Sequence, residues 1–165
     1  MSHEFCSNMA TELSVTIVSA SYRLAPEHRL PAAYDDAMEA LYWIKTSNDN
    51  WLENYVDLSN VFLMGGSAGG NIAYHLRLRA VEQVDTLLPL KIKGLILHQH
   101  FFGVVERTES ELRIDNPGFP PCFSDLMWEL SLPMGVDRDH EYRNPILMEG
   151  VRCWVSWGSI DRPSN

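Results

Sequence analysis

A serine between glycines is the part of this 165-residue sequence whose residue types and spacing could do chemistry. Gly65, Ser67 and Gly69 follow the pattern Gly-x-Ser-x-Gly, directly after the apolar run Val61–Met64 and directly before a helical pattern. In this context the pattern is typical of a sharp strand-to-helix turn that strains the serine backbone and exposes its hydroxyl group. We expect glycine to be required at both Gly65 and Gly69, because only glycine leaves room for the strand and the helix to approach each other there.

This turn predicts a nucleophile together with one donor for a developing oxyanion. Ser67 Oγ would attack a carbonyl carbon, and the N–H of Ala68, at the start of the helix, would donate to the oxyanion. The alternative is a glycine-rich turn that only packs tightly or binds phosphate. A Walker A motif needs Lys after its second Gly, and the dinucleotide fingerprint needs a different Gly spacing, so the sequence favours acyl chemistry.

Short apolar runs that alternate with helical patterns would position this turn. Behind Pro31, a stripe at i, i+4 spacing predicts a helix and consists of Ala33, Ala37, Leu41 and Ile44. The runs that read as buried strands are Ser14–Ser21, Val61–Met64, Ile92–His98 and Val151–Ser156. The alternation predicts the α/β class, with a mostly parallel sheet and flanking helices.

The stretch 101–145 interrupts this alternation. Four prolines frame one helical window, Ser124–Leu130, in which Ser124 would be the N-cap. We expect a helical, lid-like insertion at 101–145. A chain of this length would bury roughly 68–70% of its unfolded surface, which is enough for one domain, so residues 1–165 are predicted to form a single domain.

Composition and charge exclude several classes of protein. With 13 Lys and Arg against 22 Asp and Glu, the net charge of −9 repels phosphate backbones, so no nucleic-acid partner is expected. No run approaches the ~20 apolar residues of a membrane-spanning helix. A secretory signal needs a basic start, and no Lys or Arg precedes Arg23, so no such signal is expected. Three cysteines at spacings unlike a metal knuckle predict a reducing, cytoplasmic setting and no metal site.

A family resemblance runs through six stretches, in the same order as in the family: residues 5–10, 22–36, the Ser67 turn, 94–99, 106–111 and 135–140. Together they resemble the plant carboxylesterases of the hormone-sensitive-lipase-like branch of α/β-hydrolases, to which gibberellin receptors are also similar. The resemblance implies an α/β-hydrolase fold, an acyl-enzyme mechanism, a small-molecule carboxylic ester as substrate, and no metal or organic cofactor. It leaves the oligomeric state open.

The resemblance also assigns roles to individual residues. Ser67 matches the nucleophile and Ala68 the oxyanion donor, while Gly66 stands where the family usually has Asp. Asp161 aligns with the acid of the catalytic triad, and an exposed aspartate near the end of the sequence is the alternative for it.

Two parts of the family pattern are missing from this sequence. The triad histidine follows the acid in the family, but none of the four residues after Asp161 is a histidine, and the upstream His-Gly-Gly loop is absent. A base would have to be recruited from upstream, and the candidates are His98 and His100 at the end of a predicted strand, with a structural role as the alternative for His98. His75, on the helix after Ser67, would pack or face water.

These gaps predict a partial fold and weak activity. The fold would lack N-terminal strands and the C-terminal strand with its histidine, and the family strand order places a missing strand between Ser14–Ser21 and Val61–Met64. Losing one oxyanion donor costs about 10²–10³ in rate, and losing the base removes most of the ~10⁶ from a triad, so the chain should be nearly inert. The alternatives are a non-catalytic small-molecule binding protein similar to gibberellin receptors, and an incomplete gene product.

Overall fold

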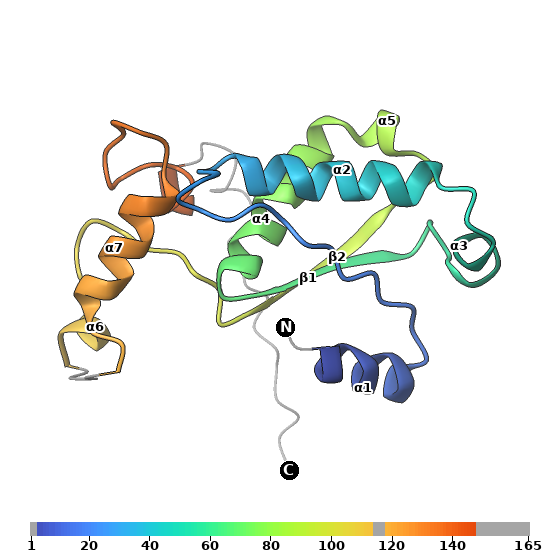
Figure 1. Cartoon of the computed structure of the whole chain (residues 1–165), viewed down its shortest axis with the longest axis horizontal. Coiled ribbons are helices and arrows are strands. Elements are labelled where there is room, and N and C mark those ends of the chain that lie inside the picture. The colour runs from blue at the N-terminus through green and yellow to red at the C-terminus, as the bar shows by residue number, and fades with distance from the viewer. Residues whose placement is uncertain (1–2, 114–117, 148–165) are drawn as a thin grey trace, which may run out of the picture.

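A computed structural model describes residues 3–113 and 118–147. In this part of the chain, β1 (Val61–Gly66) and β2 (Ile92–His98) form a parallel pair, and the crossover between them contains α4 (Ala68–Glu82) and α5 (Val84–Leu87). α2 (Ala32–Thr46) packs along α4 on the same side of the strands, whereas α1 (His3–Leu13) lies on the opposite side (Figure 1). The described residues thus have the strand–helix–strand arrangement of an α/β protein.

Three helices and one turn of 3-10 helix complete the described elements. They are α3 (Asn50–Tyr55), α6 (Glu109–Arg113), α7 (Pro121–Ser131) and η1 (Pro145–Leu147). α6 and α7 lie beyond the carboxyl ends of the two strands, at the opposite end of the molecule from α3 (Figure 1). The described parts of the stretch 101–145, residues 101–113 and 118–145, therefore lie next to the edge of the sheet at which α/β proteins form their sites.

The main hydrophobic core lies between the two strands and the helices α2 and α4. Its buried members are Met38, Leu41, Leu63, Ala73, Leu76, Ala80, Leu87 and Leu90. The predicted stripe on α2 faces this region, since Ala33 and Leu41 are buried and Ala37 and Ile44 pack against core residues. The predicted helix behind Pro31 is confirmed, with Pro31 as its N-cap residue.

The predicted strand Ser14–Ser21 is wrong for the described structure. This stretch has no ladder hydrogen bonds, and Val15 and Val18 are 46% and 41% exposed. It is attached through single contacts, such as the bond from Thr16 Oγ1 to the carbonyl of Tyr55 at 3.3 Å. β-branched residues favour a strand only where a neighbour supplies the ladder, and neither of the described strands pairs with this stretch. Predicted strand Val151–Ser156 lies outside the described residues.

The helix in the 101–145 stretch begins earlier than the sequence predicts. α7 runs from Pro121 to Ser131, so Ser124 lies inside the helix and is not its N-cap, and Pro120 occupies that position. Proline fits the first helical turn because its fixed φ suits the helix and no N–H donor is needed there.

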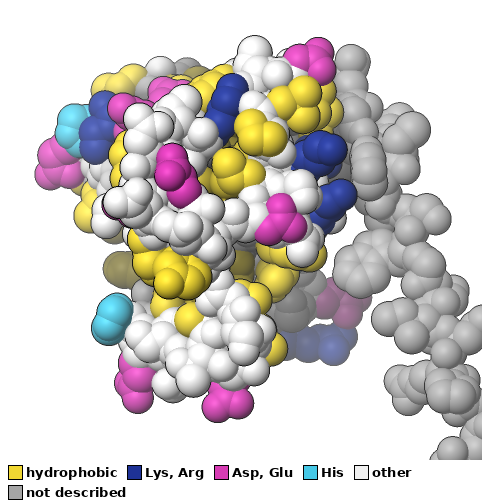
Figure 2. Space-filling model, turned by 90° about the vertical axis from the view of Figure 1, so that its right-hand side faces the viewer, with side chains coloured by type: hydrophobic (Ala, Val, Ile, Leu, Met, Phe, Trp, Pro, Cys, Tyr) yellow, Lys and Arg dark blue, Asp and Glu magenta, His cyan; other side chains and the backbone are white. Residues whose placement is uncertain are grey.

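The outer face of the sheet and the α3 side of the molecule expose apolar side chains. On the strands, Phe62 is 55% and Ile96 is 47% exposed. Figure 2 shows hydrophobic side chains at the surface on the α3 side, where Trp51 and Tyr55 are 49% and 71% exposed. Among the described helices, none is both long enough and apolar enough to cross a membrane.

Candidate active site

Ser67 occupies the turn between β1 and α4. β1 ends at Gly66, α4 begins at Ala68, and the residue between them has φ 51° and ψ −124°. A positive φ is strained for a residue with a Cβ, and Ser67 is exposed. The predicted strand–turn–helix context and the strained serine backbone are therefore confirmed.

Only some of the glycines around Ser67 lie where the strand and the helix approach too closely for a Cβ. A Cβ on Gly65 would lie 1.9 Å from the carbonyl oxygen of Gly69, so Gly65 is required. A Cβ on Gly69 would meet nothing within 4 Å, so the prediction for this residue is wrong. The second required glycine is Gly70, whose Cβ would lie 2.9 Å from the Cβ of His100. At Gly66 a Cβ would make only an ordinary contact at 3.5 Å.

Backbone hydrogen bonds hold Ser67 on the strand side of the turn. Its N–H donates to the carbonyl of His98 at 3.1 Å, and its carbonyl accepts from the N–H of Phe101 at 3.0 Å. Ala68 is the first residue of α4, in the turn whose N–H groups have no partner within the helix. The side chain of Ser67 and the first N–H groups of α4 therefore lie next to each other at the edge of the sheet.

His98 and His100 lie next to this turn, but the structure does not join either imidazole to it. His98 ends β2 opposite Gly66 and is exposed, and His100 follows two residues later with its ring 5.1 Å from that of Phe102. Within the described residues, no hydrogen bond links an imidazole to Ser67 Oγ. Asp161, the predicted triad acid, lies outside the described residues.

A buried polar cluster lies beneath the turn and was missed at the sequence level. The Tyr34 hydroxyl donates to Asn71 Oδ1 at 2.7 Å, and Asn71 Nδ2 donates to the carbonyl of Tyr142 at 2.8 Å. His75, one turn after Asn71 on α4, is 3% exposed and stacks on Tyr34 with ring centroids 4.6 Å apart. The i, i+4 spacing of Asn71 and His75 was the only signal in the sequence, because it places both on one face of a helix.

Burial sets the ionisation of this cluster. It lowers the pKa of His75 from 6.5 to about 4, partly offset by the carbonyl of Tyr142. Burial also raises the pKa of Tyr34 far above its usual value. Both rings are therefore neutral at physiological pH.

The stretch 101–145 is joined to the site by an aromatic stack. The rings of Phe101 and Trp128 are parallel within 2° and 4.7 Å apart, and the N–H of Phe101 is bound to Ser67. Arg29 ties the same stretch to the loop before α2, since its Nη1 donates to the carbonyls of Glu129 and Leu132 at 2.6 and 2.8 Å. The position of α7 is thus coupled to the backbone of the turn.

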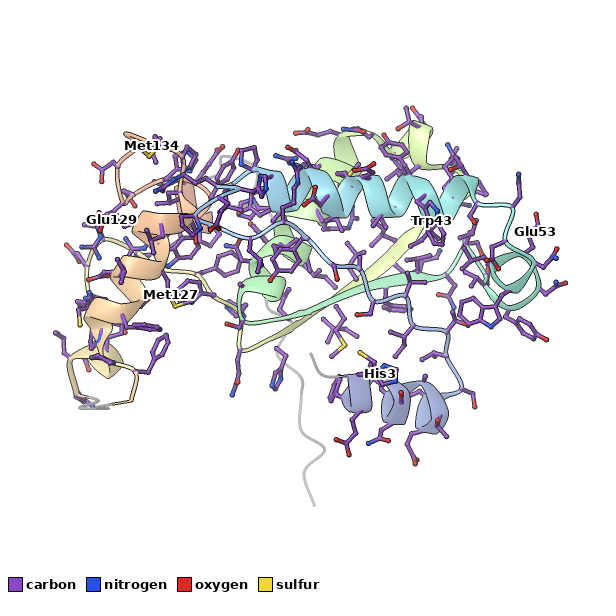
Figure 3. The ribbon with its side chains drawn as sticks, in the orientation of Figure 1. His3, Trp43, Glu53, Met127, Glu129 and Met134 are labelled. Atoms are coloured by element: carbon purple, nitrogen blue, oxygen red, sulfur yellow. The ribbon has the colours of Figure 1, made fainter. Side chains whose placement is uncertain are left out.

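An open hollow of about 420 Å³ lies at the carboxyl end of α7. Glu129 and Met134 both line it and lie at the same end of the molecule (Figure 3), whereas Ser67 is not among its lining residues. In the described part of the chain, no group of His, Cys, Asp or Glu side chains is arranged to hold a metal ion.

Replacing Ser67 by glycine should stabilise the fold. Ser67→Gly removes the Cβ that makes a φ of 51° unfavourable, and we expect the free energy of unfolding to rise by about 1 kcal/mol. Urea unfolding monitored by tryptophan fluorescence measures the change. Ser67→Ala keeps the Cβ and is the matched control, so equal stabilities of the two variants would contradict the strain argument.

Comparison with known proteins identifies the family. A family model described as alpha/beta hydrolase fold matches residues 1–158. Carboxylesterase 20 of Arabidopsis thaliana is 62% identical over 149 residues, which are 90% of this chain and 46% of the relative. A 3-O-acetylpapaveroxine carboxylesterase of Papaver somniferum is 52% identical over 153 residues, covering 88% and 48%, and a gibberellin receptor of Arabidopsis thaliana is 42% identical over 144 residues, covering 86% and 38%.

Solved structures agree with this result. An esterase of Pyrobaculum calidifontis superposes with a TM-score of 0.71 at 27% identity, covering 86% of this chain and 45% of that structure. The chain spans about half the length of the curated relatives it matches. The chain therefore belongs to the α/β-hydrolase fold family, and its relatives include plant carboxylesterases.

Proposed function

We propose that this chain carries the nucleophile of a carboxylesterase. Ser67 Oγ attacks the carbonyl carbon of a small carboxylic ester, the alcohol leaves, and water then releases the acid from the acyl-enzyme. The observation that supports this role best is the exposed serine at a positive φ between β1 and α4. The Papaver somniferum relative, named for an acetylated substrate, makes acetyl esters the first substrates to test.

The oxyanion donor, the acid and the base complete the proposed site. Ala68 N–H, in the first turn of α4, is our candidate oxyanion donor, with Gly65, Gly66 and Gly69 forming the rest of the turn. Asp161 is the proposed triad acid by resemblance. His98 and His100 are the candidate bases because His98 ends the strand paired with β1 and His100 follows two residues later, although neither imidazole is bonded to Ser67 Oγ in the part of the chain that the structure describes.

We therefore expect slow acylation by the 165-residue chain itself. An activated serine has a base within hydrogen-bond reach, and the oxyanion hole needs a second donor besides Ala68. Small-molecule esters with good leaving groups, such as p-nitrophenyl acetate, require the least proton transfer and are the most sensitive substrates for this chain. The assignment involves no metal ion, cofactor or nucleic acid.

A fluorophosphonate probe tests the proposal directly. We expect covalent labelling of the folded chain at Ser67, identified by peptide mass spectrometry, and no labelling of Ser67→Ala. Circular dichroism on the same samples establishes that both are folded. A folded wild-type chain that stays unlabelled after prolonged incubation would count against a nucleophilic role for Ser67.

Non-catalytic binding of a small molecule is the second candidate function. It is favoured by the 42% identity to a gibberellin receptor over 144 residues. Calorimetric titration separates the two functions, because saturable binding of a gibberellin without hydrolysis of p-nitrophenyl acetate is expected only of a receptor.

A further inference from the structure

The side chain of Asn71 connects three separate parts of the chain directly beneath the turn. Asn71 is the fourth residue of α4 and is 3% exposed, and its N–H donates to the carbonyl of Ser67 at 3.3 Å. Its side-chain amide is bonded at both ends, to Tyr34 of α2 at 2.7 Å and to the backbone of Tyr142 at 2.8 Å. One amide group thus fixes the first turn of α4 to α2 and to the end of the 101–145 stretch.

Tyr34 is a rigid partner for this amide. It is fully buried, its ring stacks on His75, and the ring of Tyr142 meets it edge-on with centroids 5.0 Å apart. The Arg79 guanidinium lies 5.3 Å from the ring centroid. Because the carbonyl of Tyr142 can only accept, the Asn71 amide nitrogen must donate to it, which leaves the Asn71 oxygen to accept from the Tyr34 hydroxyl.

The turn itself needs support from outside. The backbone of Ser67 is held at a positive φ, and such a conformation persists only where surrounding contacts fix it. On the strand side those contacts come from His98 and Phe101. On the helix side, the Asn71 amide joins the first turn of α4 to Tyr34 and Tyr142 through two side-chain hydrogen bonds.

We propose that Asn71, held by Tyr34 and Tyr142, is a positioning residue that sets the orientation of Ser67 and of the first N–H groups of α4. Through Tyr142, the same amide makes the geometry of the turn depend on the position of the 101–145 stretch. The positioning role rests on the proposed function, since it concerns the orientation of the nucleophile, but the linkage itself can be measured without catalysis.

Tyr34→Phe is the test variant because it keeps the ring and its stack on His75 and removes only the hydroxyl. The matched control is Tyr42→Phe, on the same helix, whose hydroxyl donates to Gln83 at the surface. Hydrogen exchange of the Gly70 and Asn71 amides, both bonded to the carbonyl of Ser67, reports on the turn. We expect about tenfold faster exchange at these two amides in Tyr34→Phe, with β2 amides unchanged, and no change at the turn in Tyr42→Phe.

Two outcomes would overturn the positioning role. Unchanged exchange at the turn means that the amide does not support it, and equal acceleration throughout α4 and β2 means that Tyr34 only stabilises the fold as a whole. Asn71→Ala, which removes both bonds, is the second variant and should accelerate exchange at the turn at least as much as Tyr34→Phe.

Hydrolysis of p-nitrophenyl acetate separates this inference from the proposed function. If the wild-type chain is active, Tyr34→Phe should lower kcat about tenfold with KM unchanged, because the ester still binds but the nucleophile is misaligned. A fall that appears only in KM would contradict positioning. If the wild-type chain neither hydrolyses the ester nor reacts with fluorophosphonate, the proposed function fails, and the exchange measurement still decides whether Asn71 orders the turn.

Discussion

Gly65→Ala should abolish the turn that carries Ser67, whereas Gly69→Ala should leave it intact. The added Cβ at Gly65 would lie 1.9 Å from the carbonyl oxygen of Gly69 and 2.6 Å from the nitrogen of Gly70, and both are backbone atoms of α4. Backbone atoms cannot move aside as a flexible side chain can, so β1 and α4 must separate. We expect a loss of about 3 kcal/mol or more in the free energy of unfolding, or no folded protein.

Gly69→Ala is the matched control because it adds the same methyl group two residues beyond Ser67. Nothing lies within 4 Å of its Cβ, and alanine favours the helix, so we expect a gain of about 0.5 kcal/mol. Urea unfolding of the two variants and wild type provides the comparison. Similar losses of unfolding free energy in both variants would show that the close approach of β1 and α4 at Gly65 does not determine the stability of this turn.

The turn could be predicted from the sequence because its determinants are contiguous. The apolar run of β1, the glycine before Ser67 and the helical pattern of α4 together occupy one short stretch, and each specifies its local backbone without help from the rest of the chain. The error at Gly69 has the same origin. A motif gives the positions of its glycines, but only three-dimensional distances distinguish a crowded glycine such as Gly70 from a glycine with open space around it.

The support beneath the turn could not be predicted, because it joins residues far apart in the sequence. Tyr34 and Asn71 are separated by 37 positions, and Asn71 and Tyr142 by 71. No periodic pattern in the sequence indicates which residues pair. In addition, the partner of the Asn71 amide nitrogen is a backbone carbonyl, which every residue has. The failed strand at Ser14–Ser21 is the same limitation in a sheet, since pairing depends on a neighbour that local sequence cannot specify.

His75 should make the stability of the fold depend on pH in the mildly acidic range. An unfolded histidine binds a proton near pH 6.5, but burial lowers the pKa in the folded chain to about 4. Between these values the unfolded state binds more protons than the folded state, so stability is fully present above pH 6.5 and is lost as the pH falls toward 4. The difference corresponds to about 3 kcal/mol.

His75→Phe isolates this contribution because phenylalanine keeps an aromatic ring between Tyr34 and Tyr142 and cannot titrate. We expect urea unfolding of the wild type at pH 4.5, 5.5, 6.5 and 7.5 to show a steeper fall in stability on acidification than that of the variant. Protonation of carboxylates such as Asp36 acts equally on both proteins, so it cancels in the comparison. Parallel profiles for wild type and His75→Phe would mean that the folded chain accommodates a charged imidazole, which a ring 3% exposed among Tyr34, Tyr74 and Tyr142 should not allow.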